Sequence, residues 1–257
     1  MYAWISTGGG NIMAGWNLKE GACTNFSATD QELWDALIHL LTTTHKTTTY
    51  KFCFLKSLLD VVSKDQSLTL DFKTIFKRFA NIYWELIVNY DLCQVYENSS
   101  FSKSKVEQII EQTIDLDPDY KKPFIHDLPL DVQEKLYSDI QKYCSRNVVG
   151  AFFESTNGLF YSFSKKDKKV RLSPRALEFM VQYFIAIEEL NYYNWAKMIE
   201  KINGDKTPKS LVTKMSKLGT VDALHSSLPV ITQKYRLEDI LPWSFNTQEV
   251  NISDRIT

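Results

Sequence analysis

Apolar residues recur every three or four positions through the first ninety residues, and this spacing predicts three amphipathic helices. The first begins near Thr29, which precedes Glu32 by three residues as in a capping box. The second and third lie within residues 49–63 and 71–90. The apolar positions of the three stripes are Leu33, Ala36, Leu37, Leu40 and Leu41; Phe52, Leu55, Leu58, Leu59 and Val62; and Phe72, Ile75, Phe76, Phe79, Ile82, Tyr83, Leu86 and Ile87. We expect these helices to pack together.

Two polar segments interrupt the helical pattern. Residues 94–104 are rich in serine and charged side chains, and residues 115–130 contain three prolines, so both are predicted to be loops. Helices are expected on either side of the second loop, over residues 105–114 and 130–144.

The pattern changes at Val148, where apolar and polar residues begin to alternate. The dipeptide Asn157-Gly158 accepts the positive φ of a tight hairpin turn, so we expect a β-hairpin there, with a third short strand from Val170 to Leu172. Helical spacing resumes after Ser173, a favourable N-cap, and we expect a break near Asn191.

These elements predict a mainly α protein, namely a helical bundle with a small β-hairpin in its second half that could form a winged-helix-like unit. The predicted divisions are a flexible leader over residues 1–28, a helical domain over 29–147, a hairpin with helices over 148–218, and a C-terminal tail over 219–257.

Composition places the chain among ordinary globular proteins, with 44% hydrophobic and 24% charged residues in 257. It has neither the ~18 uninterrupted apolar residues of a membrane span nor the pattern of a signal peptide at its start, so we expect a cytoplasmic protein. The four cysteines include no C-x-x-C pair, which argues against a zinc knuckle or a disulfide framework. Cys53 lies in an apolar run and is expected to be buried.

The net charge of −1 conceals an uneven distribution of charge. Residues 141–257 contain 17 Lys and Arg against 12 Asp and Glu, whereas residues 1–140 contain 13 against 19. A basic surface of this kind suits the phosphates of nucleic acid. The candidate nucleic-acid-binding residues are Lys165, Lys166, Lys168, Lys169 and Arg171. The alternative is a solvated loop without a ligand.

Other chemical signals are weak. The four histidines are scattered, and Glu188 and Glu189 are expected on a helix surface without a partner at ligand spacing. We therefore expect no metal, no cofactor and no small-molecule ligand.

Four segments are similar to a known family in the same order along the chain. They are "YKFCFLKSLLD", "TIFKRFANIYWELIVNYDLCQ", "NVVGAFFESTNGLFYSF" and "LNYYNWAKMIEKIN". Residues 50–203 thereby resemble the N-terminal helical region of bacterial HNH endonucleases associated with phage defence. In that family a cysteine-paired metal nuclease module follows, with a line resembling D-H-F-I-P-W-S-F whose His is the general base.

The corresponding line here, "EDILPWSF", departs from the family at the catalytic positions. Glu238 stands where the resemblance places the metal-binding Asp, and Asp239 stands where it places the His. An Asp with an ordinary pKa near ~4 is a poor base at neutral pH. No Asn-His pair follows, and no paired cysteines precede the line.

Two functional hypotheses follow. The first is a non-catalytic subunit of an antiphage defence complex, which binds nucleic acid or a partner such as an ATPase or nuclease chain. For that partner, the aromatic stripe Tyr192, Trp195 and Ile199 is a candidate surface; the alternative is that it belongs to the core. The second hypothesis is a diverged metal-dependent endonuclease that uses Glu238 and Asp239.

Overall fold

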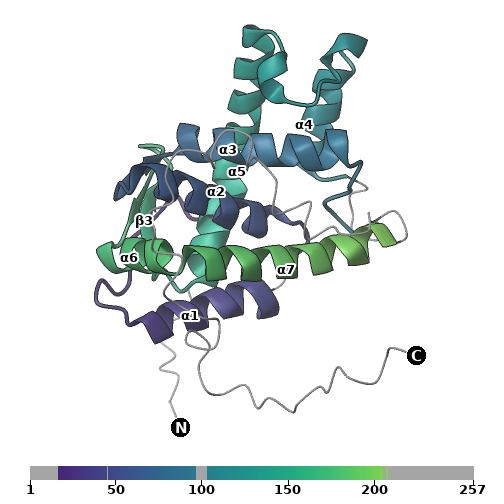
Figure 1. Cartoon of the computed structure of the whole chain (residues 1–257). Coiled ribbons are helices and arrows are strands. Elements are labelled where there is room, and N and C mark those ends of the chain that lie inside the picture. Colours follow the sequence, from purple (N-terminus) through teal and green to yellow (C-terminus); the bar gives the residue numbers. More distant parts are fainter. Residues whose placement is uncertain (1–16, 45, 97–102, 205–206, 208–257) are drawn as a thin grey trace, which may run out of the picture. The chain divides into compact units, whose positions relative to one another are not determined.

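A computed structural model of the chain describes residues 17–44, 46–96, 103–204 and 207. The chain divides into two units, Met1–Val221 and Asp222–Thr257, and every described residue belongs to the first. The described part is mainly helical with one small antiparallel sheet, so the predicted fold class is confirmed (Figure 1). Among the described helices, none is both long enough and apolar enough to cross a membrane.

Three helices form in the first ninety residues, as predicted. They are α1 (Asp30–Ile38), α2 (Tyr50–Asp65) and α3 (Phe72–Trp84), with one π-helical turn after α1, η2 (His39–Thr43), and another after α3, η3 (Glu85–Asn89). The capping box at the start of α1 is present, because the Thr29 hydroxyl accepts from the Glu32 N–H and the Glu32 carboxylate accepts from the Thr29 N–H. This reciprocal pairing satisfies two N–H groups that the helix itself leaves open.

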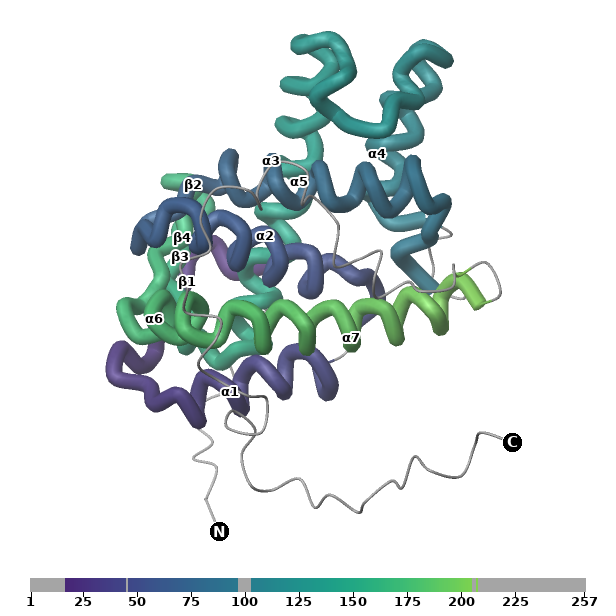
Figure 2. Tube along the Cα trace, in the orientation of Figure 1, coloured from purple at the N-terminus to yellow at the C-terminus, as the bar shows by residue number. Residues whose placement is uncertain are grey.

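The core is built around α2, which contacts α3, α5, α6 and α7. Residues 52–62 of α2 are buried on all sides, and so is the predicted stripe of α3 except for the half-buried Ile87. Figure 2 shows α2 between α3 and α7. A helix enclosed in this way loses its amphipathic pattern, because each face meets another element.

Helix α4 (Lys105–Ile114) precedes two short 3₁₀ turns, η4 (Pro118–Tyr120) and η5 (Ile125–Asp127), and then the longest helix, α5 (Leu130–Ser155). The proline-rich segment is tied to α3 and η3, since Trp84 Nε1 donates to the carbonyl of Lys122 over 2.9 Å and Asn89 Nδ2 donates to that of Pro123 over 3.1 Å. The division predicted between residues 147 and 148 falls inside α5, so one helix spans both segments.

The sheet joins strands from distant parts of the chain. Strands β1 (Glu20–Gly21), β2 (Thr69–Asp71), β3 (Tyr161–Ser164) and β4 (Lys169–Leu172) are arranged antiparallel in the order β1-β3-β4-β2. The β3–β4 hairpin therefore occupies the centre of the sheet and has a partner strand on each side. Strand β1 lies within the segment that the sequence assigned to a leader.

The hairpin turn is not at the predicted dipeptide. Asn157 and Gly158 have positive φ values of 51° and 67°, but they end α5, where the Gly158 N–H donates to the carbonyl of Phe153 over 2.8 Å. The hairpin turns instead through residues 165–168, with Lys168 at a φ of 55°. Asn-Gly suits any left-handed position, and here that position is a helix C-terminus.

The last two helices are α6 (Pro174–Gln182) and α7 (Phe184–Asn203). Ser173 caps α6 as predicted, accepting from the Ala176 N–H over 3.1 Å. The break between the helices lies at Tyr183, and the break expected near Asn191 is wrong. Asn191 is buried inside α7, where its side chain donates to the carbonyl of Phe52 on α2 over 3.1 Å.

Candidate functional site

Three of the basic residues, Lys165, Lys166 and Lys168, lie in the hairpin turn, which Ser164 and Asp167 close. The Ser164 hydroxyl donates to the Asp167 carboxylate over 2.8 Å and accepts from the Asp167 N–H over 3.1 Å. The carbonyl of Lys168 accepts from the N–H of Phe72 at the start of α3 over 2.8 Å. Asp167, the only acidic residue between positions 164 and 171, thus helps to form the turn.

Strand β4 alternates between core and solvent. Val170 and Leu172 are buried, whereas Lys169 and Arg171 are exposed. In the sheet register Arg171 lies opposite Ser162 on one side and Thr69 on the other. Lys169 lies opposite Ser164 on one side and the exposed Asp71 on the other. The outer face of the sheet therefore presents two cations, Arg171 next to hydroxyl side chains and Lys169 next to a hydroxyl and a carboxylate.

The five predicted residues do not form one uniform group. Lys166, Lys168, Lys169 and Arg171 are exposed and have no ion pair with another described residue. Lys165 is half-buried, and its Nζ donates to the carbonyl of Arg146 on α5 over 2.6 Å. Burial, and then the charge of Arg146, lower the pKa of Lys165. We call the four exposed cations the hairpin cluster.

The candidate partner surface on α7 is part of the core. Tyr192, Trp195 and Ile199 are 2%, 0% and 0% exposed. The Trp195 ring stacks on Phe52 of α2 with centroids 6.2 Å apart and planes inclined by 12°. Helical spacing correctly places the three residues on one face, but α2 covers that face, and the assignment of these residues to a partner surface is wrong.

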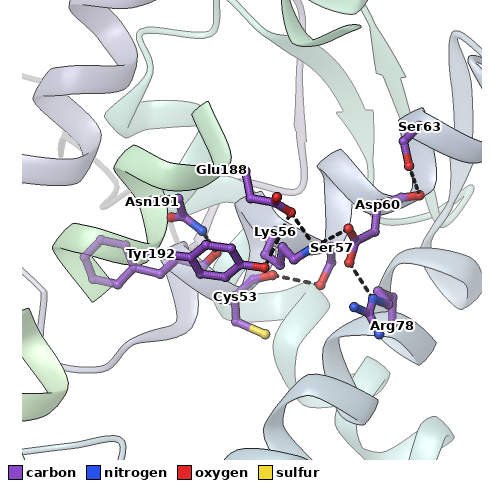
Figure 3. A network of polar contacts seen from close by, with 10 residues as sticks. Cys53, Lys56, Ser57, Asp60, Ser63, Arg78, Glu188, Asn191 and Tyr192 are labelled. Atoms are coloured by element: carbon purple, nitrogen blue, oxygen red, sulfur yellow. Dashed lines mark hydrogen bonds and ion pairs between the residues drawn. The ribbon is translucent and has the colours of Figure 1, made fainter. Parts of the chain in front are cut away.

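A buried ion-pair network, absent from the sequence-based predictions, joins α2, α3 and α7 (Figure 3). Lys56 of α2 contacts Asp60 one turn later and reaches the Glu188 carboxylate of α7 at 2.7 Å. Arg78 of α3 approaches the other Asp60 oxygen at 2.5 Å. The side chains of Lys56 and Asp60 are 4% and 9% exposed.

The network balances two positive charges with two negative ones. The ring of Tyr192 lies 5.8 Å from Lys56 Nζ, and its hydroxyl donates to Glu188 over 3.4 Å. Burial, followed by the charge of Glu188, raises the pKa of Tyr192. Glu188 is therefore a half-buried ion-pair partner of Lys56 and not the free surface carboxylate that the sequence indicated. One feature of the sequence could have indicated this network: Lys56 and Asp60 are spaced i, i+4 inside an apolar run, so they can form an ion pair on one helix.

The other candidates within the described residues add no further cluster of reactive groups. Among the described residues no three His, Cys, Asp or Glu side chains lie close enough together to hold a metal ion. Cys53 is fully buried, as predicted, and burial raises the pKa of its thiol. Glu238 and Asp239 lie outside the described residues.

Comparisons of the chain with family models, curated proteins and solved structures find no match. The resemblance to phage-defence endonucleases consequently stays a prediction from the sequence.

Proposed function

We propose that this chain is a non-catalytic, nucleic-acid-binding subunit of a bacterial antiphage defence complex, and that the hairpin cluster contacts DNA phosphates. The observation that carries the proposal is that four cations are exposed within six residues and have no ion pair with another described residue. Cations in this state bind phosphates favourably, because they release counterions from the DNA.

The anchoring of the turn supports the same proposal. The turn is closed by Ser164 and Asp167 and held against α3 through Phe72. A contact surface that is ordered before binding loses less conformational entropy when the ligand arrives. Three of the four cations are lysines, which act as point charges, so we expect contact with the backbone of the DNA and little preference for base sequence.

The defence role and the partner chain rest on the sequence resemblance over residues 50–203. In that family the helical region precedes a nuclease module, and here Asp239 stands at the position of the general base. The proposal therefore assigns cutting or ATP hydrolysis to another chain of the complex.

Fluorescence anisotropy with a labelled DNA duplex of about 30 base pairs, long enough to cover a binding site of ordinary size, tests the binding. The informative variant is Lys166→Glu with Lys168→Glu, and the matched control is Lys121→Glu with Lys135→Glu, two exposed lysines near α4 and on α5. We expect the hairpin variant to bind roughly tenfold or more weakly at low salt and to show a shallower dependence of log Kd on log salt concentration. The control variant should bind like the natural protein.

Two results would contradict the proposal. If the hairpin variant binds DNA as tightly as the natural protein across the salt titration, the hairpin cluster does not contact DNA. If the protein cleaves DNA with magnesium or manganese and Asp239→Ala abolishes the cleavage, the chain is a diverged endonuclease and not a non-catalytic subunit.

A further inference from the structure

The outer side of α7 carries a row of side chains spaced four residues apart. In chain order the row consists of Ile185, Glu189, Tyr193 and Lys197. All four are exposed, Ile185 by 42% and Tyr193 by 59%. The opposite side of the same helix is buried against α2. Residues four apart form a continuous ridge on a helix, so these four side chains make one raised line across the surface.

The two charges of this ridge have no ionic partner within the described part of the protein. Neither Glu189 nor Lys197 forms an ion pair with another described residue. Lys197 Nζ lies 6.0 Å from the centre of the Tyr193 ring, so the aromatic ring and the cation are already side by side. Tyr193 is exposed beside Lys197, and tyrosine is among the residues enriched in protein contact surfaces.

The two charged residues of the ridge lie at equal distances on either side of Tyr193 and have opposite signs. Glu189 comes four residues before Tyr193 and Lys197 four residues after it, about 6 Å along the axis in each direction. A second α7 laid antiparallel across the first, with both Tyr193 side chains near the crossing point, brings each Glu189 opposite a Lys197. A parallel arrangement brings like charges together.

We infer that this ridge is the contact between two copies of the chain, related by a two-fold axis that passes near Tyr193. Packing of i, i+4 ridges is the commonest way in which helices cross, and a two-fold contact uses the same surface on both subunits. The inference commits to a second copy because the ridge is complementary to itself. It is independent of the proposed binding of nucleic acid.

Sedimentation equilibrium of the full chain, over a range of concentrations and at low salt, tests the inference. We expect a reversible dimer. Glu189→Lys and Lys197→Glu should each weaken it by roughly tenfold or more, because each change replaces two attractive pairs by two repulsive ones. Circular dichroism melting checks that both variants fold, as expected for substitutions at exposed positions.

Restoring the complementarity gives the sharpest test. In the double variant with Glu189→Lys and Lys197→Glu the two charges are exchanged, so each new Lys faces a new Glu and the dimer should recover. An equimolar mixture of the two single variants should also associate, because the introduced lysine of one variant then faces the introduced glutamate of the other. Glu134→Lys, an exposed change of equal charge on α5, serves as the control and should leave the dimer intact.

Three results would overturn the inference. They are a monomer at every concentration, a dimer that neither single variant weakens, and a dimer that both weaken but that the double variant does not restore. Loss of DNA binding in the hairpin variant with an intact dimer would leave the inference standing, so the two proposals are tested separately.

Discussion

The backbone N–H of Phe72 donates a hydrogen bond over 2.8 Å to the carbonyl of Lys168, almost one hundred residues later in the chain. This bond joins the turn of the β3–β4 hairpin to the first turn of α3. Phe72 is itself buried, and its ring contacts Phe76 edge-on at 5.8 Å. The buried residue Phe72 thereby fixes the position of the hairpin turn that carries the exposed cluster.

Lys168 offers a way to separate stability from binding. Its φ of 55° is unfavourable for a residue with a Cβ, and glycine adopts it without strain. Lys168→Gly keeps the carbonyl that accepts from Phe72, so we expect the free energy of unfolding to rise by up to about 1 kcal/mol. DNA affinity should fall in the same variant because a cation is lost. Urea denaturation and anisotropy measure the two effects, and a parallel loss of both would contradict the assignment.

The buried network predicts a large effect from removing one charge. Lys56→Met leaves Glu188 without its cation and Asp60 with Arg78 alone, so unfolding should become easier by about 3–5 kcal/mol. Lys64→Met, an exposed change on the same helix, should alter the free energy by less than about 0.5 kcal/mol. Urea denaturation of both variants measures the difference.

A double-mutant cycle identifies the cause of that loss. Adding Glu188→Gln to Lys56→Met removes the uncompensated carboxylate, and part of the lost stability should return. Strictly additive effects of the two substitutions would show that Lys56 and Glu188 are not energetically coupled.

Trp195 should behave as a core residue. Its side chain is fully buried and stacks on Phe52, so Trp195→Ala should lower the free energy of unfolding by about 3–5 kcal/mol. The control is Phe26→Ala, because Phe26 is a large aromatic residue that is mostly exposed. A soluble Trp195→Ala protein with an unchanged melting temperature would contradict the assignment of Trp195 to the core.

Lys46 should make the free energy of unfolding vary with pH in the alkaline range. Burial, and then the charge of Lys51, lower its pKa from 10.5 to about 8. The folded state therefore binds fewer protons than the unfolded chain between these two values, and the free energy of unfolding rises with pH across that window. Below about pH 8 the cost of the buried charge is fully present.

Lys46→Met removes this titration. Denaturation curves from about pH 7 to about pH 10, which span the folded and the ordinary pKa, should show a smaller rise in stability for Lys46→Met than for the natural protein. The exposed change Lys121→Met should keep the natural slope. Equal slopes in all three proteins would mean that Lys46 keeps an ordinary pKa in the folded state.

Local chemistry made most of the helices predictable. Thr29 and Ser173 cap their helices within a few residues of sequence, and the period of the α3 stripe alone identifies its buried face. Asn157-Gly158 shows the limit of such reasoning, because the dipeptide specifies a left-handed backbone but not whether a hairpin or a helix end uses it.

The candidate site was only partly predictable, because its determinants are distant in sequence. The basic hairpin residues were visible from composition, but burial of Lys165 depends on contact with α5. Helical spacing placed Tyr192 and Trp195 on one face without indicating that α2 covers it. Lys56 and Glu188 are far apart in the chain, so their pairing exists only once α2 and α7 have packed.

The sheet order also governs how the chain can associate. Its outer strands, β1 and β2, are two and three residues long, so they offer few unpaired backbone groups along either margin. Long, flat margins are what allow a foreign strand to add and what start aggregation, whereas short ones discourage both. The longer strands β3 and β4 are shielded from such addition by lying between them. The architecture of the sheet thus disfavours growth into fibrils by strand addition.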